Sequence, residues 1–258
     1  MLLNKLKEED FTVLKGSLES GRQSPNSLGG MLILAIFLQS LLFIVIYMVG
    51  GDRSSFPNKD ILFMVHLVVT IVVIVLSIVY AIPYIYMKYQ KTQYMLTIIV
   101  SQNLFGISFY ICALLFIGKN RDITTNSLMM FTYVTLIIGG LIFISTCIRF
   151  YILLRKGSYR TGTKKDRLRG KFEKKSYLPM VIIGSIGLVF ILQYLVRTFG
   201  LEGIDTIVMM TLFISLFYAM LFVLPEQLVI LYCKYRFDSF NFKEDGTLKP
   251  MGNDRKDA

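Results

Sequence analysis

The sequence predicts an all-α protein, a polytopic membrane bundle of about six transmembrane helices that forms a single membrane domain over residues 1–258. Apolar residues make up 54% of the chain and charged residues only 17%, whereas soluble domains average about 45–50% and about 25%. Six apolar runs are long enough to cross a hydrocarbon core of about 30 Å. The charged residues lie mainly between these runs, and in lipid a helix satisfies the hydrogen bonds of its own backbone.

The expected elements follow one another along the chain. A polar segment, 1–30, comes first, and its Glu8, Glu9 and Asp10 are unlike the start of a cleaved signal peptide, so we expect a retained first helix. A basic connection covers 155–177, and a polar tail covers 234–258. The six spans are predicted near 31–50, 61–87, 95–118, 128–154, 178–199 and 206–233.

The distribution of Lys and Arg predicts the orientation. The 155–177 connection alone carries ten basic residues, and the segments on the opposite side of the membrane carry only Arg53, Lys59, Lys119 and Arg121. Because loops rich in Lys and Arg stay in the cytoplasm, both termini should be cytoplasmic, and an even number of spans agrees with that. We expect a multi-pass protein of the cell membrane.

The basic connection permits two interpretations. It can fix the topology by lying against anionic lipid headgroups at the cytoplasmic face, or it can bind a cytoplasmic partner or a specific lipid. No nucleotide-binding loop is present, and the net charge of +11 is explained by membrane topology rather than by nucleic acid. The basic residues concerned are Lys164, Lys165, Arg167, Arg169, Lys171, Lys174 and Lys175.

Two charged residues of opposite sign lie within predicted spans. Arg149 is six residues before Arg155, and Glu226 is eight residues before Lys234, which places them about 9 Å and about 12 Å inside their basic borders. Both helices run in the same direction, so we expect Arg149 and Glu226 to face each other as an intramembrane charge pair. Such a pair can fix the packing, or it can be a gated charge or proton site.

Other polar side chains in or near the spans are candidates for interhelical hydrogen bonds or for a narrow polar path. They are His66, Gln102, Asn103 and Gln193. Intramembrane amides often bond between helices, and a histidine near the outer end of a span is ordinarily solvated or satisfied, with a pH sensor as the alternative.

The composition argues against catalysis and against a bound cofactor. The chain has one histidine and three cysteines, which are widely spaced, so we expect no histidine-cluster metal site and no CxxC pair. Glu226 is the only acid well inside a span, and no nucleophile lies beside a base in the pattern that intramembrane hydrolysis requires. We expect a protein that is not an enzyme.

The last span ends PEQLVILYCKYRFDSF, residues 225–240. In this helix end and in its overall style, the chain resembles uncharacterised six-span membrane proteins of low-GC Gram-positive bacteria that are encoded near toxin or type VII secretion genes. It is also similar in length and layout to permease halves of bacterial ABC exporters, although the long basic loop after the fourth span departs from that pattern. No residue role follows from either resemblance.

Three functions stay open at this point. The first resemblance implies an immunity or secretion-accessory protein that acts through a membrane protein partner or as a homo-oligomer. The second implies a transporter or permease subunit for a small substrate or peptide. A third hypothesis is a membrane-organising protein that binds anionic lipid through the basic connection.

Overall fold

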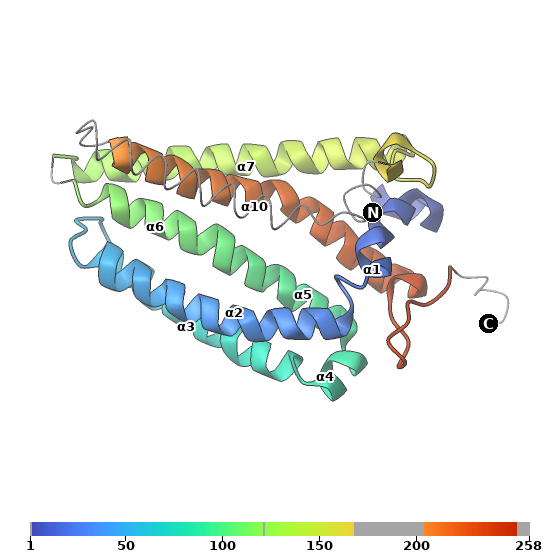
Figure 1. Cartoon of the computed structure of the whole chain (residues 1–258). Coiled ribbons are helices and arrows are strands. Elements are labelled where there is room, and N and C mark those ends of the chain that lie inside the picture. Colours follow the sequence, from blue (N-terminus) through green and yellow to red (C-terminus); the bar gives the residue numbers. More distant parts are fainter. Residues whose placement is uncertain (1, 121, 168–203, 252–258) are drawn as a thin grey trace.

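The structure is an all-α membrane helix bundle (Figure 1). A computed structural model describes residues 2–120, 122–167 and 204–251. Within these residues, five helical stretches are long and apolar enough to cross a membrane, and the only β feature is an isolated bridge between Phe242 and Leu248. The first two spans are α2 (Pro25–Val45) and α3 (Lys59–Tyr80). The third is composite and consists of α5 (Gln90–Ser101), η4 (Gln102–Ile107) and α6 (Ser108–Ile117). The other two are α7 (Thr125–Arg155) and α10 (Ile204–Arg236).

Local sequence signals set where these helices begin and end. Ser24 and Thr124 cap α2 and α7, because each side chain accepts a hydrogen bond from a backbone N–H three residues on. Pro25 occupies the first turn of α2, where its missing N–H costs nothing. The expected span 61–87 instead divides at Pro83, which cannot donate into the preceding turn, into α3 and a short α4 (Pro83–Lys88).

The composite third span lies at the centre of the bundle. α2, α3 and α10 all contact it. In its most apolar stretch of 18 residues 61% of the residues are buried, against 6% in the corresponding stretch of α10. Its middle turn, η4, is a π-helix, a local widening that is common at functional sites. The expected span 178–199 lies outside the described residues.

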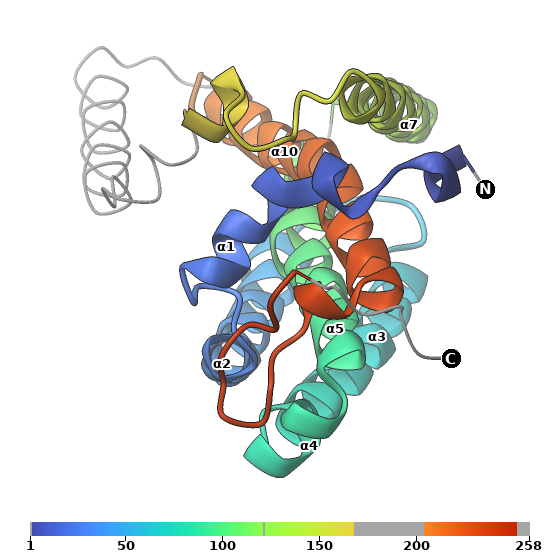
Figure 2. The same cartoon turned by 90° about the vertical axis from the view of Figure 1, so that its right-hand side faces the viewer.

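Both chain ends contribute to a folded layer at one end of the bundle, which we call the terminal end (Figures 1 and 2). Phe11 and Leu14 from the N-terminal side and Phe240 and Phe242 from the C-terminal side share one buried cluster with the ends of α5, α7 and α10. Part of the N-terminal segment is therefore packed into the fold. The short elements here are η1 (Leu2–Lys5), η2 (Glu8–Lys15), α1 (Gly16–Glu19) and η5 (Asp238–Phe240), and η3 (Ile46–Gly51) extends α2 at the opposite end.

Candidate functional site

A cluster of buried amides and a hydroxyl lies in the middle of the bundle, and we call it the amide cluster. Asn103 of η4 donates from Nδ2 to Gln39 Oε1 of α2 at 2.9 Å and to Thr70 Oγ1 of α3 at 3.4 Å. All three residues are at most 4% exposed. Within the described residues, Gln39 Nε2 and Asn103 Oδ1 have no hydrogen-bond partner. The cluster joins three helices and retains one unused donor and one unused acceptor.

His66 lies nearer the opposite end of the bundle and is buried. Its Nδ1 is 3.2 Å from the Tyr47 hydroxyl, and its Nε2 is 3.2 Å from Ser108 Oγ. The ring also packs at 5.2 Å from Phe43, centroid to centroid. The histidine expected near the outer end of a span is thus enclosed, with a polar neighbour on each ring nitrogen, and it connects α2, α3 and α6.

Gln102 points away from the amide cluster, toward α10. It donates from Nε2 to the Met220 carbonyl at 3.2 Å and reaches Gln227 Oε1 at 3.5 Å. α10 continues through Pro225, which has no N–H, so the Leu221 carbonyl one turn earlier has no helical donor. Met220 directly precedes Leu221. Adjacent residues of η4 therefore bond to opposite sides of the central span, Asn103 to α2 and α3 and Gln102 to α10.

Arg149 and Glu226 line one cavity of about 230 Å³ between α7 and α10. The Arg149 guanidinium lies 5.9 Å from the centroid of the Phe222 ring, over the ring, and Lys165 also lines the cavity. The contacts among the described residues do not include a direct ion pair between Arg149 and Glu226. The helices bring the two residues to one cavity, and their pairing stays a prediction.

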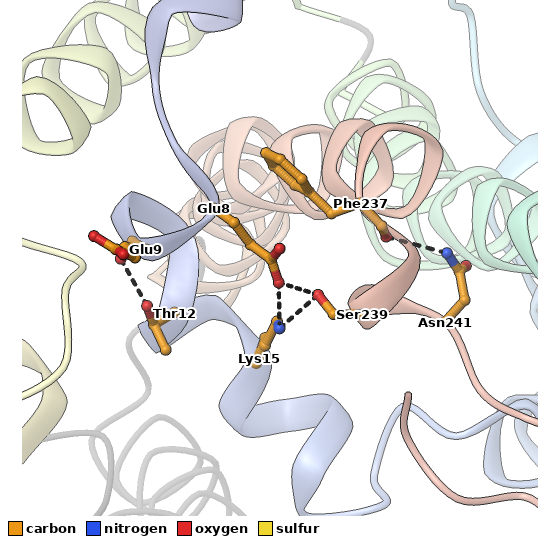
Figure 3. A network of polar contacts seen from close by, with 7 residues as sticks. All are labelled: Glu8, Glu9, Thr12, Lys15, Phe237, Ser239 and Asn241. Atoms are coloured by element: carbon orange, nitrogen blue, oxygen red, sulfur yellow. Dashed lines mark hydrogen bonds and ion pairs between the residues drawn. The ribbon is translucent and has the colours of Figure 1, made fainter. Parts of the chain in front are cut away.

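A second polar assembly lies at the terminal end, and we call it the terminal network (Figure 3). Lys15 Nζ lies 2.8 Å from Glu8 Oε1 and donates to Ser239 Oγ at 2.6 Å. Ser239 in turn donates to the same Glu8 oxygen. The Lys15 side chain is 2% exposed, and its hydrogen bond to Ser239 is a buried tie between the N-terminal and the C-terminal side of the chain.

The first part of the basic connection docks on the N-terminal segment. Arg160 Nε lies 2.7 Å from Asp10 Oδ1, and the Val13 N–H donates to the Tyr159 carbonyl at 2.9 Å. Lys165 lies over the Tyr159 ring, 3.9 Å from its centroid. These contacts show that residues 155–165 are partly built into the fold.

The remaining predicted site residues divide into two groups. Lys164 and Arg167 are exposed and close together in a helical turn. The others lie outside the described residues, namely Gln193, Arg169, Lys171, Lys174 and Lys175.

Sequence reasoning missed the cations that are buried at the terminal end. Lys234 is 1% exposed, and its ammonium donates to the Phe240 carbonyl at 3.0 Å and lies over the rings of Tyr94 and Phe242. The burial of Lys234 could have been predicted from its position in the helix, directly after Cys233 and four residues after Ile230, both of which are buried. A lysine on the apolar stripe of a helix is a candidate for burial rather than for solvent.

No protein-family model, curated protein or solved structure matches this chain.

Proposed function

We propose that this chain is a non-enzymatic multi-pass membrane protein that acts by binding another membrane protein within the bilayer, in an immunity or secretion-accessory role. The observation that supports the proposal is a row of small residues on α10. Thr211, Ser215 and Ala219 are spaced one helical turn apart and are all exposed. Exposed small side chains on a lipid-facing helix let a second helix approach closely.

The chain's own packing shows how it uses a small residue for this purpose. Gly139 of α7 faces α10 so closely that an added Cβ would lie 2.9 Å from Leu221 Cδ1 and 3.3 Å from Phe217 Cε1. That contact occupies one face of α10. The row on α10 offers the same kind of close approach on a face that no other part of the described residues buries, beside the exposed Leu212 and Phe222.

The proposal is tested with a photo-crosslinking amino acid at Leu212, in membranes of cells that produce the chain together with a candidate toxin or secretion protein. We expect a protein adduct that disappears when Ser215→Leu and Ala219→Leu fill the row. The same amino acid at Val72 of α3, which is 51% exposed, is the control and should react only with lipid.

A matching functional assay measures protection from the toxin, or secretion, with the same pair of leucine substitutions. We expect loss of that activity at unchanged protein level. Adducts only with lipid, or only with the chain's own predicted span 178–199, would refute a partner on this face.

A transporter is the second candidate, and the amide cluster favours it. An unused donor on Gln39 and an unused acceptor on Asn103 in the middle of a membrane bundle are suited to a polar solute or a water molecule. Purified chain in liposomes should then move a small polar solute, and Gln39→Leu with Asn103→Leu should stop it. The absence of flux in the unmodified protein would contradict this candidate.

The Arg149 and Glu226 cavity belongs to the same question. Arg149→Ala, Glu226→Ala and the double variant are compared in the activity assay that applies. If the charges form a gate, each variant loses activity and the double variant does not recover it. Normal activity of the charge-free double variant would show that the two residues serve packing alone.

A further inference from the structure

A cavity of about 520 Å³ opens at the terminal end, between the stretch that joins α4 to α5 and the C-terminal segment after α10. Figure 2 shows the C-terminal segment running beside these helices at that end. The volume is within the range of about 300–1,000 Å³ that is typical of small-ligand sites. Its charged lining consists of Lys88, Lys91, Lys243, Lys249, Asp238 and Glu244.

The walls of the cavity are held by specific hydrogen bonds. Gln90 Nε2 donates to the Phe242 carbonyl at 3.0 Å, and the Phe242 N–H donates to Gln90 Oε1 at 2.9 Å. A short hairpin then folds back, because Lys243 N–H donates to the Thr247 carbonyl at 2.8 Å and Lys249 N–H to the Asn241 carbonyl at 3.0 Å. Lys243 and Lys249 are therefore positioned by the fold, opposite the stretch that carries Lys88 and Lys91.

The cavity has more positive than negative charge. Among the described residues, its four lysines form no ion pair with Asp238 or Glu244. The ammonium groups of Lys88 and Lys91 lie instead over tyrosine rings, 5.6 Å and 5.4 Å from the centroids.

Two further charges lie near this lining. The buried Lys234 lies behind it, 5.4 Å from the centroid of the Phe242 ring. On the hairpin, hydrogen bonds from the Thr247 side chain and backbone lower the pKa of Asp245, so this exposed carboxylate stays ionised close to Lys243. The lining itself keeps an excess of cations, which suits an anion.

The tyrosines around the cavity indicate its level in the membrane. Tyr84, Tyr89 and Tyr235 are 78%, 48% and 56% exposed. Tyrosine is enriched at the headgroup level of a bilayer, where its ring is in apolar surroundings and its hydroxyl is in water. Tyr89 and Tyr235 line the cavity itself, so the lysines lie at the level of lipid phosphates.

We propose that this cavity binds the phosphate of an anionic phospholipid headgroup, with Lys88, Lys91, Lys243 and Lys249 as the contacting cations. The site is separate from the basic connection and does not depend on the function proposed above. An inorganic phosphate shares the same chemistry, and the position of the cavity at the tyrosine level favours the lipid.

The test uses the full chain, purified in mild detergent and delipidated. Native mass spectrometry measures binding of added phosphatidylglycerol, with phosphatidylcholine as the neutral lipid. We expect preferential binding of phosphatidylglycerol, and about 25-fold weaker binding in the variant Lys91→Gln with Lys249→Gln, from about fivefold for each basic residue. Inorganic phosphate at low millimolar concentration should not displace the lipid.

The matched control is Lys5→Gln with Lys156→Gln, which removes the same charge from two exposed lysines of the terminal end outside the cavity. It should weaken binding by less than about threefold. Lys88→Gln with Lys243→Gln, at exposed positions, repeats the test if the first variant does not fold. Equal loss in cavity and control variants, no preference between the two lipids, or displacement by phosphate would each overturn the proposal.

Discussion

Replacement of Lys15 by methionine tests the tie between the two ends of the chain. Methionine keeps most of the side-chain volume and removes the ammonium group that lies 2.8 Å from Glu8 and 2.6 Å from Ser239. Lys15 also lies over the Phe240 ring, 4.9 Å from its centroid. The substitution leaves the Glu8 carboxylate without its cation.

The expected cost follows from the burial of the two partners. Removal of one member of a buried ion pair costs about 3–5 kcal/mol. The Glu8 side chain is 23% exposed, so water recovers part of that cost and we expect about 2 kcal/mol. Adding Glu8→Gln removes the isolated charge and should restore about half of the loss.

Hydrogen exchange of the full chain in detergent is the appropriate measurement. Amides of 8–19 and 237–242 should exchange about 30-fold faster in Lys15→Met, because about 1.4 kcal/mol corresponds to a factor of ten. Amides of α5 should be unchanged. Lys5→Met, at an exposed position of the same segment, is the control. If Lys15→Met exchanges like that control, the terminal network does not hold the two ends together.

Two further predictions concern the membrane interior. Asn103→Leu should destabilise the bundle by about 1–2 kcal/mol, because it leaves the buried amide of Gln39 without its partner. The double variant with Gln39→Leu should lose less stability than the two single variants added together. Thermal unfolding of all three variants measures this coupling, and additive losses would contradict a direct hydrogen bond. Gly139→Ala should lower the stability of the bundle by about 1 kcal/mol, because the added methyl group forces α7 and α10 apart. Gly140→Ala has nothing within 4 Å of the added Cβ and should be neutral or slightly stabilising. Equal effects of the two substitutions would argue against the close approach at Gly139.

The span positions could be predicted from sequence because they depend on length and local signals. An apolar run of about 20 residues crosses a bilayer whatever its neighbours are, and Ser24, Thr124 and Pro83 mark helix boundaries by local chemistry. The predicted starts were a few residues late for α2 and α5, because polar residues such as Asn26 and Gln93 belong to these helices and are excluded from an apolar run.

The polar contacts could not be predicted in the same way. Lys15 and Ser239 are 224 residues apart, and no periodicity connects them. α7 and α10 are apolar on nearly all faces, so the sequence does not say which face is covered. Gln102 bonds to α10 and Asn103 to α2 and α3, and a single sequence does not say which neighbouring helix either side chain meets.

The structure separates two kinds of basic residue that the charge count treats alike. Lys15, Lys234 and Arg160 are engaged by a carboxylate or a carbonyl of the chain itself, so they stabilise the terminal layer whichever way the protein is inserted. Lys88, Lys91, Lys243 and Lys249 line an open cavity without such partners among the described residues. Only the second group gains from an anionic leaflet. If the termini are cytoplasmic, as the charge distribution predicts, the cavity faces the cytoplasmic leaflet and its anionic lipids. With the opposite insertion the topology prediction would be wrong, and anionic lipid of the cytoplasmic leaflet could not bind these four lysines.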